Sequence, residues 1–400
     1  MTSSYQMPVF SPLPVAFERG EGAWLWDTAG RRYLDALAGI AVCGLGHAHP
    51  RITQALCDQA SKVTHTSNWY EIPLQAKLAE GLCRLSGMDN AFFCNSGAEA
   101  NEAAIKIARL YGHQRKILTP GIIVTEGSFH GRTLATLSAT GNRKIQAGFE
   151  PLVQGFYRVP YNDAASVAQV GERTQDIVAV LVEPITGEGG IVVPDSGYLK
   201  ELRRICDDHG WLLMFDEIQT GMCRTGKWFA CQHEQVVPDV MTLAKGLGNG
   251  VPIGACLARG DAAGVFQPGN HGSTFSGNPL VCRVALEVID ILRSGNFDRR
   301  ATELGERMLA GLHRELGSVA GIQEIRGRGL MLAVELDRPC KELTRLALDA
   351  GLLINVTAER IVRLLPPLVI TDAEADQIVE VLGGVVRNFL ASSQDRNAAP

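Results

Sequence analysis

Two charged residues that follow apolar runs are the first candidates for chemistry in this chain. Lys245 follows residues 240–244, and Asp216 follows residues 212–215. A partly desolvated lysine amine attacks carbonyl groups, and a nearby cation lowers its pKa further. A carboxylate can hold a proton on the nitrogen of an aromatic heterocycle. Together the two residues predict chemistry on a cofactor that carries both a carbonyl group and a ring nitrogen.

A third candidate is a phosphate site at residues 95–99. Asn95-Ser96-Gly97-Ala98 follows a short apolar strand and opens a helix, with Ser96 and Glu99 in a capping-box pattern. Gly97 lets the backbone approach a ligand, and the free N–H groups and dipole of a helix N-terminus attract phosphate. Pyridoxal 5′-phosphate (PLP) has an aldehyde, a ring nitrogen and a phosphate, so the three candidates together predict this cofactor.

Each candidate also has a structural alternative. The 95–99 pattern could be only a helix cap, Asp216 could cap a turn, and Lys245 could be a solvated lysine before the glycine-rich stretch 246–250. Glu217 could take the role given to Asp216. The strand pattern favours Asp216, as the first residue beyond the strand.

Two arginines add a possible substrate site. Arg132 follows an apolar segment, and Arg363 interrupts one. Two guanidinium groups could bind the two carboxylates of a dicarboxylic amino acid. The alternative is a salt bridge at the surface or between domains.

Length and composition limit the class of protein. The 400 residues are too many for one hydrophobic core, and 46% apolar with 20% charged residues is ordinary for a globular enzyme. A net charge of -5 gives no electrostatic reason to expect nucleic acid or an anionic membrane as partner. The ten cysteines form no C-x-x-C pair. His47 and His49 could be metal ligands, but without a third ligand nearby a turn with structural histidines is favoured, so no metal site is expected.

Residues 1–14 lack the order of charged and apolar residues that a signal peptide has, and no apolar stretch reaches membrane-spanning length. We therefore expect a cytoplasmic protein.

Apolar runs alternate with amphipathic stretches through the middle of the chain. Residues 23–37 predict a hairpin, and strands are predicted at 91–94, 122–125, 177–182, 211–215, 240–244 and 253–258. Helices are predicted at 98–111, stopped by Gly112, and at 198–209. This pattern is typical of an α/β domain on a mostly parallel sheet. From residue 281 the pattern changes to a smaller α+β domain, whose last helix begins with a capping box at residues 371–374.

Nine motifs in a fixed order carry a resemblance to a known family. They lie at residues 39–42, 45–50, 95–102, 129–132, 183–185, 187–190, 215–221, 271–275 and 277–279. With the spacing of Asp216 and Lys245, they make the chain resemble the class III, fold-type I, PLP-dependent aminotransferases. The resemblance implies a large PLP-binding domain (61–280) with a mostly parallel central sheet, and a smaller α+β domain made of residues 1–60 and 281–400.

The resemblance also implies how the cofactor is held. Lys245 would bind the aldehyde of PLP covalently, and Asp216 would pair with the ring nitrogen. Gly97 and Ala98 would bind the phosphate through backbone N–H groups.

Four further residues would complete the cofactor site. Phe129 would stack on one face of the ring, and Ile218 would pack on the other. Gln219 would bond the phenolic oxygen of the ring. Thr274 would reach the phosphate of the neighbouring subunit, so the resemblance implies a homodimer with shared active sites.

For the substrates, the resemblance implies that Arg132, helped by Ser273, holds the α-carboxylate of the amino donor. Arg363 would hold the α-carboxylate of glutamate or 2-oxoglutarate. Glu188 would pair with Arg363 while the amino donor reacts and move aside for the dicarboxylate. A free Arg363 would draw the amino donor in backwards, so Glu188 would discriminate by repulsion as well as by attraction.

Within the family the chain is most similar to members that act on N2-acetylornithine. This implies transfer of the δ-amino group to 2-oxoglutarate, giving N-acetylglutamate 5-semialdehyde and glutamate in arginine biosynthesis. The alternatives are another ω-amine (succinylornithine, succinyl-diaminopimelate, ornithine or 4-aminobutyrate), a PLP racemase or aminomutase, and a non-enzymatic PLP-binding regulator. Thr186 and Cys43 depart from the residues that many relatives have, and both bear on substrate choice.

Overall fold

A seven-stranded sheet forms the centre of the computed structural model, which describes residues 5–397 and, beyond Ser392, only the backbone. The strand order is β4-β10-β9-β8-β7-β5-β6, and β10 runs antiparallel to both of its neighbours while the other pairs are parallel. The strands are β4 (Asn90–Cys94), β5 (Gly121–Thr125), β6 (Phe156–Val159), β7 (Ile177–Val182), β8 (Leu212–Asp216), β9 (Val240–Leu243) and β10 (Gly254–Ala258).

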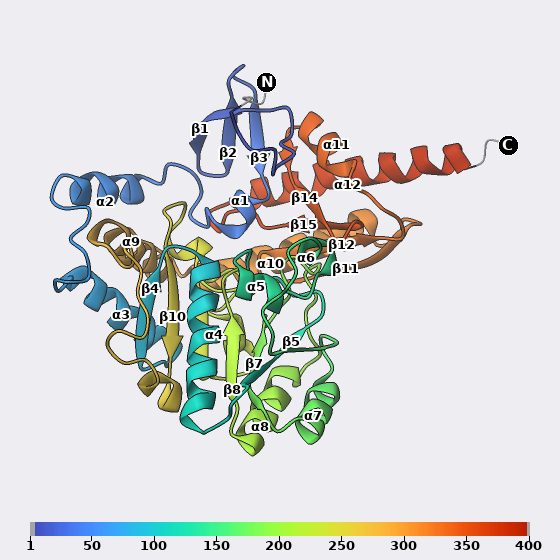
Figure 1. Cartoon of the computed structure of the whole chain (residues 1–400). Coiled ribbons are helices and arrows are strands. Elements are labelled where there is room, and N and C mark those ends of the chain that lie inside the picture. Colours follow the sequence, from blue (N-terminus) through green and yellow to red (C-terminus); the bar gives the residue numbers. More distant parts are fainter. Residues whose placement is uncertain (1–4, 398–400) are drawn as a thin grey trace.

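Helices cover this sheet, and β7, β8, β9 and β10 are buried at every residue, as expected for strands covered on both faces. In Figure 1, α4 crosses the front of the sheet, and α2 and α3 lie at one end of it. The helices are α2 (Pro50–Ala60), α3 (Pro73–Ser86), α4 (Gly97–Gln114), α5 (Leu134–Ala139), α6 (Arg143–Gln146), α7 (Ala164–Arg173), α8 (Tyr198–His209) and α9 (Pro279–Ser294). Short 3-10 turns lie at Ala230–His233, Lys245–Leu247 and Gly260–Gly264.

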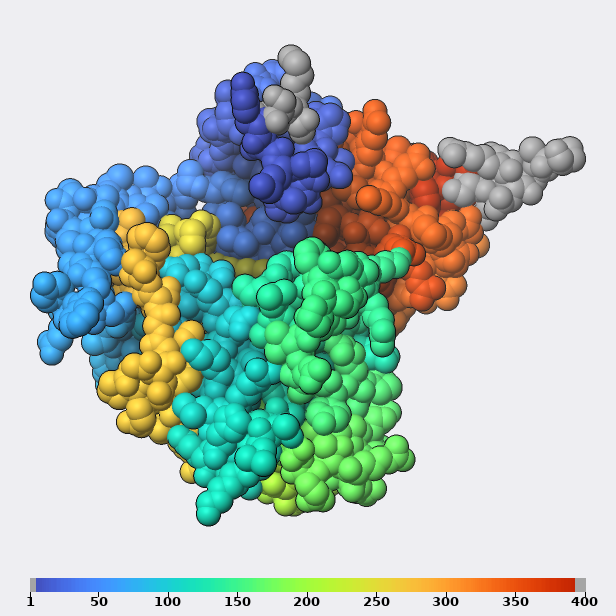
Figure 2. Space-filling view, in the orientation of Figure 1, coloured from blue at the N-terminus to red at the C-terminus, as the bar shows by residue number. Residues whose placement is uncertain are grey.

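The predicted N-terminal hairpin is confirmed, and it belongs to a second sheet. Strands β1 (Phe17–Glu21), β2 (Trp24–Asp27) and β3 (Arg32–Asp35) are antiparallel, and β13 (Leu352–Leu353) from the far end of the chain pairs parallel with β3. A short helical segment, α1 (Ala38–Ala41), follows the hairpin, with positive φ at Gly39 and Ile40. Figure 2 shows the blue N-terminal residues beside the orange C-terminal ones.

The C-terminal part of the chain forms a third, antiparallel sheet in the order β11-β12-β15-β14. Its last helix begins with the predicted capping box: Glu374 N–H donates to Thr371 Oγ1 at 3.2 Å, and Thr371 N–H donates to Glu374 Oε2 at 2.8 Å. The elements are α10 (Phe297–Leu316), β11 (Ile322–Arg328), β12 (Met331–Leu336), α11 (Leu343–Asp349), β14 (Asn355–Thr357), β15 (Ile361–Leu364) and α12 (Asp372–Asn397).

Two predicted boundaries are wrong by a short distance. The helix that was expected to stop at Gly112 continues to Gln114. A Cβ atom on Gly112 would lie 2.7 Å from Val178 Cγ1 and 2.8 Å from Pro120 Cβ, so this glycine serves close packing of α4 on the sheet. Asp216 is the last residue of β8 and pairs with Thr242, whereas the pattern placed it one residue beyond the strand.

No helix in the described part of the chain is both long and apolar enough to cross a membrane. Of the N-terminal residues expected to lack a targeting signal, 1–4 lie outside the described residues.

We predict that Gly112→Ala destabilises the protein by about 1–3 kcal/mol, because the added methyl group overpacks the contact between α4 and the sheet. Gly384→Ala in α12 is the matched control, since a Cβ there meets nothing within 4 Å. That control should be neutral or stabilising by up to about 1 kcal/mol, from the higher helix propensity of alanine. Thermal unfolding of both variants tests this prediction. If Gly112→Ala raised the melting temperature above that of the wild type by as much as Gly384→Ala, the packing role of Gly112 would be refuted.

Candidate active site

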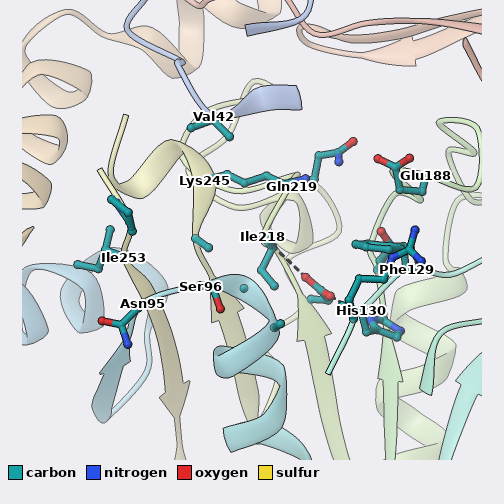
Figure 3. Close-up of a pocket in the computed structure, with 18 of the residues that line it drawn as sticks. Val42, Asn95, Ser96, Phe129, His130, Glu188, Ile218, Gln219, Lys245 and Ile253 are labelled. Carbon is teal, nitrogen blue, oxygen red and sulfur yellow. Dashed lines mark hydrogen bonds and ion pairs between the residues drawn. The ribbon is translucent and has the colours of Figure 1, made fainter. Parts of the chain in front are cut away.

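A cavity of about 400 Å³ lies at the carboxyl edge of the central sheet, where β4, β7, β8 and β9 all end. Ligands bind at this edge in open parallel sheets. Figure 3 shows residues from these elements around it, with Ser96 at the start of α4 and Lys245 beyond β9. The lining includes these candidates from the sequence: Gly97, Ala98, Phe129, Arg132, Glu188, Asp216, Ile218, Gln219 and Lys245.

The start of α4 forms a cradle on one side of the cavity. Ser96 Oγ accepts the Glu99 N–H at 3.2 Å, as the capping-box pattern predicts. The Glu99 carboxylate accepts from Asn95 N at 2.5 Å, one residue earlier than the pattern implies. A Cβ on Gly97 would lie 2.7 Å from Ile218 Cδ1, so a larger residue here would require the Ile218 side chain to shift within the cavity lining.

The Asp216 carboxylate is fixed by donors from several elements. Its Oδ2 lies 2.7 Å from Asn101 Nδ2 and 2.8 Å from His130 Nδ1, and its Oδ1 accepts from Ile218 N at 3.1 Å. Asn101 is itself held, because its Oδ1 accepts from Thr242 Oγ1 at 2.8 Å. Asp216 is therefore held at the cavity wall in one orientation.

Glu217, the alternative to Asp216, has a structural role. Its buried carboxylate accepts from Ala230 N at 2.9 Å and from Cys231 N at 2.8 Å. Burial raises the pKa of Glu217, and these hydrogen bonds, which lower it, do not cancel the shift. Of the two acids, Asp216 lines the cavity.

Lys245 is buried and adopts an unusual backbone conformation. Its φ is 46°, in the left-handed region that bulky residues rarely adopt and that clusters at functional sites. Burial lowers the pKa of its amine to about 8; Arg363 lowers it too, and Glu188 opposes both. A larger fraction of this amine is therefore neutral near pH 7 than of a solvated lysine.

Glu183 and Phe129 also line the cavity and are linked to each other. The buried Glu183 carboxylate accepts from Phe129 N at 3.2 Å and from Gly187 N at 3.1 Å, and burial raises its pKa. It thereby joins the segment that carries Phe129 to the loop that carries Glu188. The exposed Arg132 lies above Phe129, with its guanidinium carbon 5.8 Å from the ring centroid.

Arg363 forms an ion pair with Glu188, which lines the cavity. Arg363 Nη1 donates to Glu188 Oε1 at 2.6 Å and to Gln219 Oε1 at 3.4 Å, and its Nε donates to Asn355 Oδ1 at 3.1 Å. The Arg363 side chain is fully buried, whereas that of Glu188 is 35% exposed. Among the described residues, the buried Arg363 Nη2 has no hydrogen-bond partner, so it can donate to a carboxylate ligand.

Three predicted site residues lie outside the cavity lining: Arg363, Ser273 and Thr274. Ser273 Oγ accepts from Asn95 Nδ2 at 3.0 Å, which places it next to the start of α4. Thr274 is exposed to solvent and is not among the lining residues.

Several site residues were missed from the sequence. Asn101, His130 and Glu183 position candidates, and Val42 with residues 250–253 completes the lining. Asn101 carried a signal, because an asparagine on the apolar stripe of an amphipathic helix needs a buried partner. The segment 250–253 carried none.

His47, one of the two histidines considered as metal ligands, contacts a buried acid. His47 Nε2 lies 2.8 Å from Asp35 Oδ2. Burial lowers the His47 pKa, but hydrogen bonds to Asp35 and Cys43 outweigh it and raise the value to about 9. Within residues 5–397 no three His, Cys, Asp or Glu side chains are grouped as metal ligands.

The residues at this edge fit one kind of cofactor. A buried lysine, an oriented carboxylate and a helix N-terminus with its glycine cradle match an aldehyde, a ring nitrogen and a phosphate. Phe129 and Ile218 both line the space between them. Such a site on a mostly parallel sheet defines a PLP-dependent transferase of fold type I.

Known proteins identify the family. A model of the class-III aminotransferases matches residues 6–386, and the chain belongs to this family; it is a PLP-dependent aminotransferase. An acetylornithine aminotransferase from Nitrosomonas europaea is 57% identical, over 97% of this chain and 99% of that protein. One from Methanothermobacter thermautotrophicus is 44% identical, over 96% of each.

Solved structures agree with this assignment. The ornithine aminotransferase from Toxoplasma gondii has a TM-score of 0.93 and 37% identity, over 98% of this chain and 94% of that one. The acetylornithine aminotransferase from Elizabethkingia anophelis has a TM-score of 0.86 and 35% identity, over 96% of each chain.

We predict that Lys245→Met stabilises the cofactor-free protein at pH 7 by on the order of 2 kcal/mol, because a buried amine with a lowered pKa destabilises the fold when protonated. The native state binds fewer protons than the unfolded state between pH 8 and 10.5, so the wild type gains stability as pH rises through this window. The advantage of the variant should therefore shrink across it.

Urea unfolding of wild type and variant at several pH values measures the difference. Lys341→Met, at an exposed position, serves as control. A stability difference that stays constant from pH 7 to 10.5 would contradict the lowered pKa.

Proposed function

We propose that the protein transfers the δ-amino group of N2-acetylornithine to 2-oxoglutarate, giving N-acetylglutamate 5-semialdehyde and glutamate. The observation that carries this proposal is the ion pair between Glu188 and the buried Arg363 beside the cavity. The ion pair neutralises a carboxylate-binding site. The enzyme needs this because the reacting carbon of 2-oxoglutarate bears a carboxylate, whereas the reacting carbon of N2-acetylornithine does not. The names of relatives at 44–57% identity support the choice of donor.

For the cofactor we propose the following contacts. PLP, when bound, supplies a ring that withdraws electrons from the carbon bearing the amine. Lys245 holds the aldehyde and, once released, moves the proton at the reacting carbon; its lowered pKa suits this role. Asp216 keeps the ring nitrogen protonated, and the donors at Asn101 and His130 fix its orientation.

The remaining contacts with PLP are proposed from where the residues lie at the cavity. Gly97 and Ala98 offer backbone N–H groups at the start of α4 to the phosphate. Phe129 and Ile218 enclose the ring, and Gln219 reaches its phenolic oxygen.

For the substrates we propose that Arg132 binds the α-carboxylate of the amino donor, with Ser273 close to the start of α4. Arg132 lines the cavity and, in the described part of the chain, has no acidic side chain within salt-bridge distance. Arg363 binds the α-carboxylate of glutamate or 2-oxoglutarate after Glu188 turns away. The unpartnered Arg363 Nη2 supports this exchange.

We propose that the active unit is a homodimer with shared sites. Thr274 lies outside the cavity of its own chain and is exposed, as a residue that serves a neighbouring site would be. Trp69 and Phe275 are 91% and 61% exposed, and large apolar side chains of this kind favour an interface between copies.

We also propose the division into residues 1–60 with 281–400 and residues 61–280, and a place in the cytoplasm in arginine biosynthesis. The pairing of β13 with β3 supports joining the two ends of the chain in one domain.

The second candidate donor is ornithine. Its support is the TM-score of 0.93 with the ornithine aminotransferase, against 0.86 with the acetylornithine enzyme. Two positions bear on the choice. Thr186 is buried in the loop that carries Glu188, and Cys43 follows the cavity-lining Val42.

Initial rates with a panel of ω-amines test the proposal. We expect kcat/KM for N2-acetylornithine to exceed that for ornithine and 4-aminobutyrate by at least about tenfold, since a site built for a polar group rejects analogues that lack it. A higher kcat/KM for ornithine would overturn the substrate assignment and leave the reaction class intact. Turnover without 2-oxoglutarate would instead indicate a racemase or aminomutase.

Lys245→Ala should lower turnover by at least about 10²- to 10⁴-fold, because it removes the group that moves the proton. The amount of PLP released on denaturation separates lost chemistry from lost binding. Lys227→Ala, at an exposed position, is the matched control. Retained turnover in Lys245→Ala would exclude the proposed role.

A further inference from the structure

The loop that carries Glu188, residues 186–192, is tightly packed although three of its residues are glycines. A Cβ on Gly187 would lie 2.7 Å from Gln219 Cδ, and one on Gly189 would lie 2.6 Å from Gly127 O. A Cβ on Gly190 would clash with Ile361. These glycines let neighbouring groups approach the backbone on several sides, so the loop has little room to move.

Hydrogen bonds fix the backbone of the same loop. Thr357 Oγ1, on β14, donates to the carbonyl of Glu188 itself. Two residues further along, Arg326 Nη2 donates to Gly190 O at 2.7 Å and its Nε donates to Ile191 O at 3.0 Å. Within the loop, Val192 N donates to Thr186 Oγ1 at 2.9 Å.

Arg326 is itself held rigidly. Its Nη1 lies 2.6 Å from Glu335 Oε2 and 2.6 Å from Glu324 Oε2, and its side chain is only 11% exposed. A guanidinium fork held by two carboxylates and donating to two successive carbonyls has little rotamer freedom.

The sheet places Arg326 in one row with the substrate arginine. Arg326 on β11 pairs with Ala333 on β12, which pairs with Arg363 on β15, which pairs with Asn355 on β14. Residues in such a row project from the same face of the sheet. From this row Arg363 binds the side chain of Glu188, while Arg326 binds carbonyls just beyond it. The small Ala333 separates the two cations.

We propose that Arg326 is a positioning residue for substrate choice. It holds the backbone of the 186–192 loop at a fixed distance from Arg363, so that Glu188 exchanges with a substrate carboxylate by rotation of its side chain alone. This inference rests on the proposed exchange at Arg363 and extends it to a residue that touches neither substrate.

The two half-reactions should respond differently to a loss of Arg326. The reaction with the ω-amine needs Glu188 seated on Arg363, and a misplacement of about 1 Å can cost 10²-fold in rate. The reaction with glutamate needs Glu188 displaced, so a loosened loop affects it little. A purely structural role would lower both rates alike.

The test measures single-turnover kcat/KM for each half-reaction in Arg326→Gln, Arg326→Lys and Arg360→Met. Arg326→Gln should lower kcat/KM for N2-acetylornithine by roughly 10- to 100-fold and change that for glutamate by less than about threefold. Arg326→Lys should recover part of the loss. Arg360 is the matched control: it also pairs with Glu335, at 2.9 Å, but is 53% exposed and is bonded to no loop carbonyl in the described structure.

Adding Arg326→Gln to Glu188→Gln should cause no further loss in the ω-amine reaction, because Arg326 acts through Glu188. Equal losses in both half-reactions, or no loss in either, would overturn the proposal.

Hydrogen–deuterium exchange of the cofactor-free protein gives a readout independent of activity. Arg326→Gln should speed exchange of the amides in residues 186–192 by at least about tenfold, and Arg360→Met should not. Unchanged exchange in Arg326→Gln would also overturn the proposal. If the wild type prefers another ω-amine, the assigned donor is wrong, and the same comparison with the preferred amine still decides the role of Arg326.

Discussion

The buried carboxylate of Asp216 is the constraint on which the rest of the structure depends. Burying a charge costs several kcal/mol unless hydrogen bonds compensate it. Here the donors come from α4 through Asn101, from the segment after β5 through His130, and from the chain just beyond β8 through Ile218. These elements are far apart in sequence and meet because the central sheet sets their relative positions. The sheet therefore orients one acid as well as burying apolar surface.

The charge of Lys245, which also lines the cavity, is not compensated in the same way. Burial lowers the pKa of Lys245, and its backbone is held at a φ that costs free energy. The same fold thus compensates the Asp216 carboxylate with hydrogen bonds and leaves the charge of the Lys245 amine under-compensated, as the reactive role proposed for this amine requires. The strained conformation persists because the surrounding strands are buried and regular.

Local patterns predicted the elements that depend on local chemistry. The bounds of β7 and α8 were predicted correctly, because a continuous apolar run and an amphipathic stretch ended by glycine need no distant partner. Gly112 was predicted wrongly, since its role is contact with Val178 and Pro120. Lys245 and Asp216 were expected at the sheet edge because they end apolar runs, and both line the cavity there. By contrast, the pairing of Arg363 with Glu188 came from family resemblance. Arg326 was missed altogether, because a strand arginine gives no local sign of the carbonyls it reaches.

The sheet that contains the N-terminal hairpin has a further consequence. β3 takes its fourth-strand partner, β13, from near the end of the chain, and Trp24 Nε1 donates to Glu374 Oε1 at 2.7 Å. During synthesis from the N-terminus, residues 17–35 leave the ribosome long before these partners exist. The hairpin must therefore stay unfinished, with one strand edge open, while the whole central sheet is made. Closing that edge is a late event that joins residues 17–35 to residues 352–374.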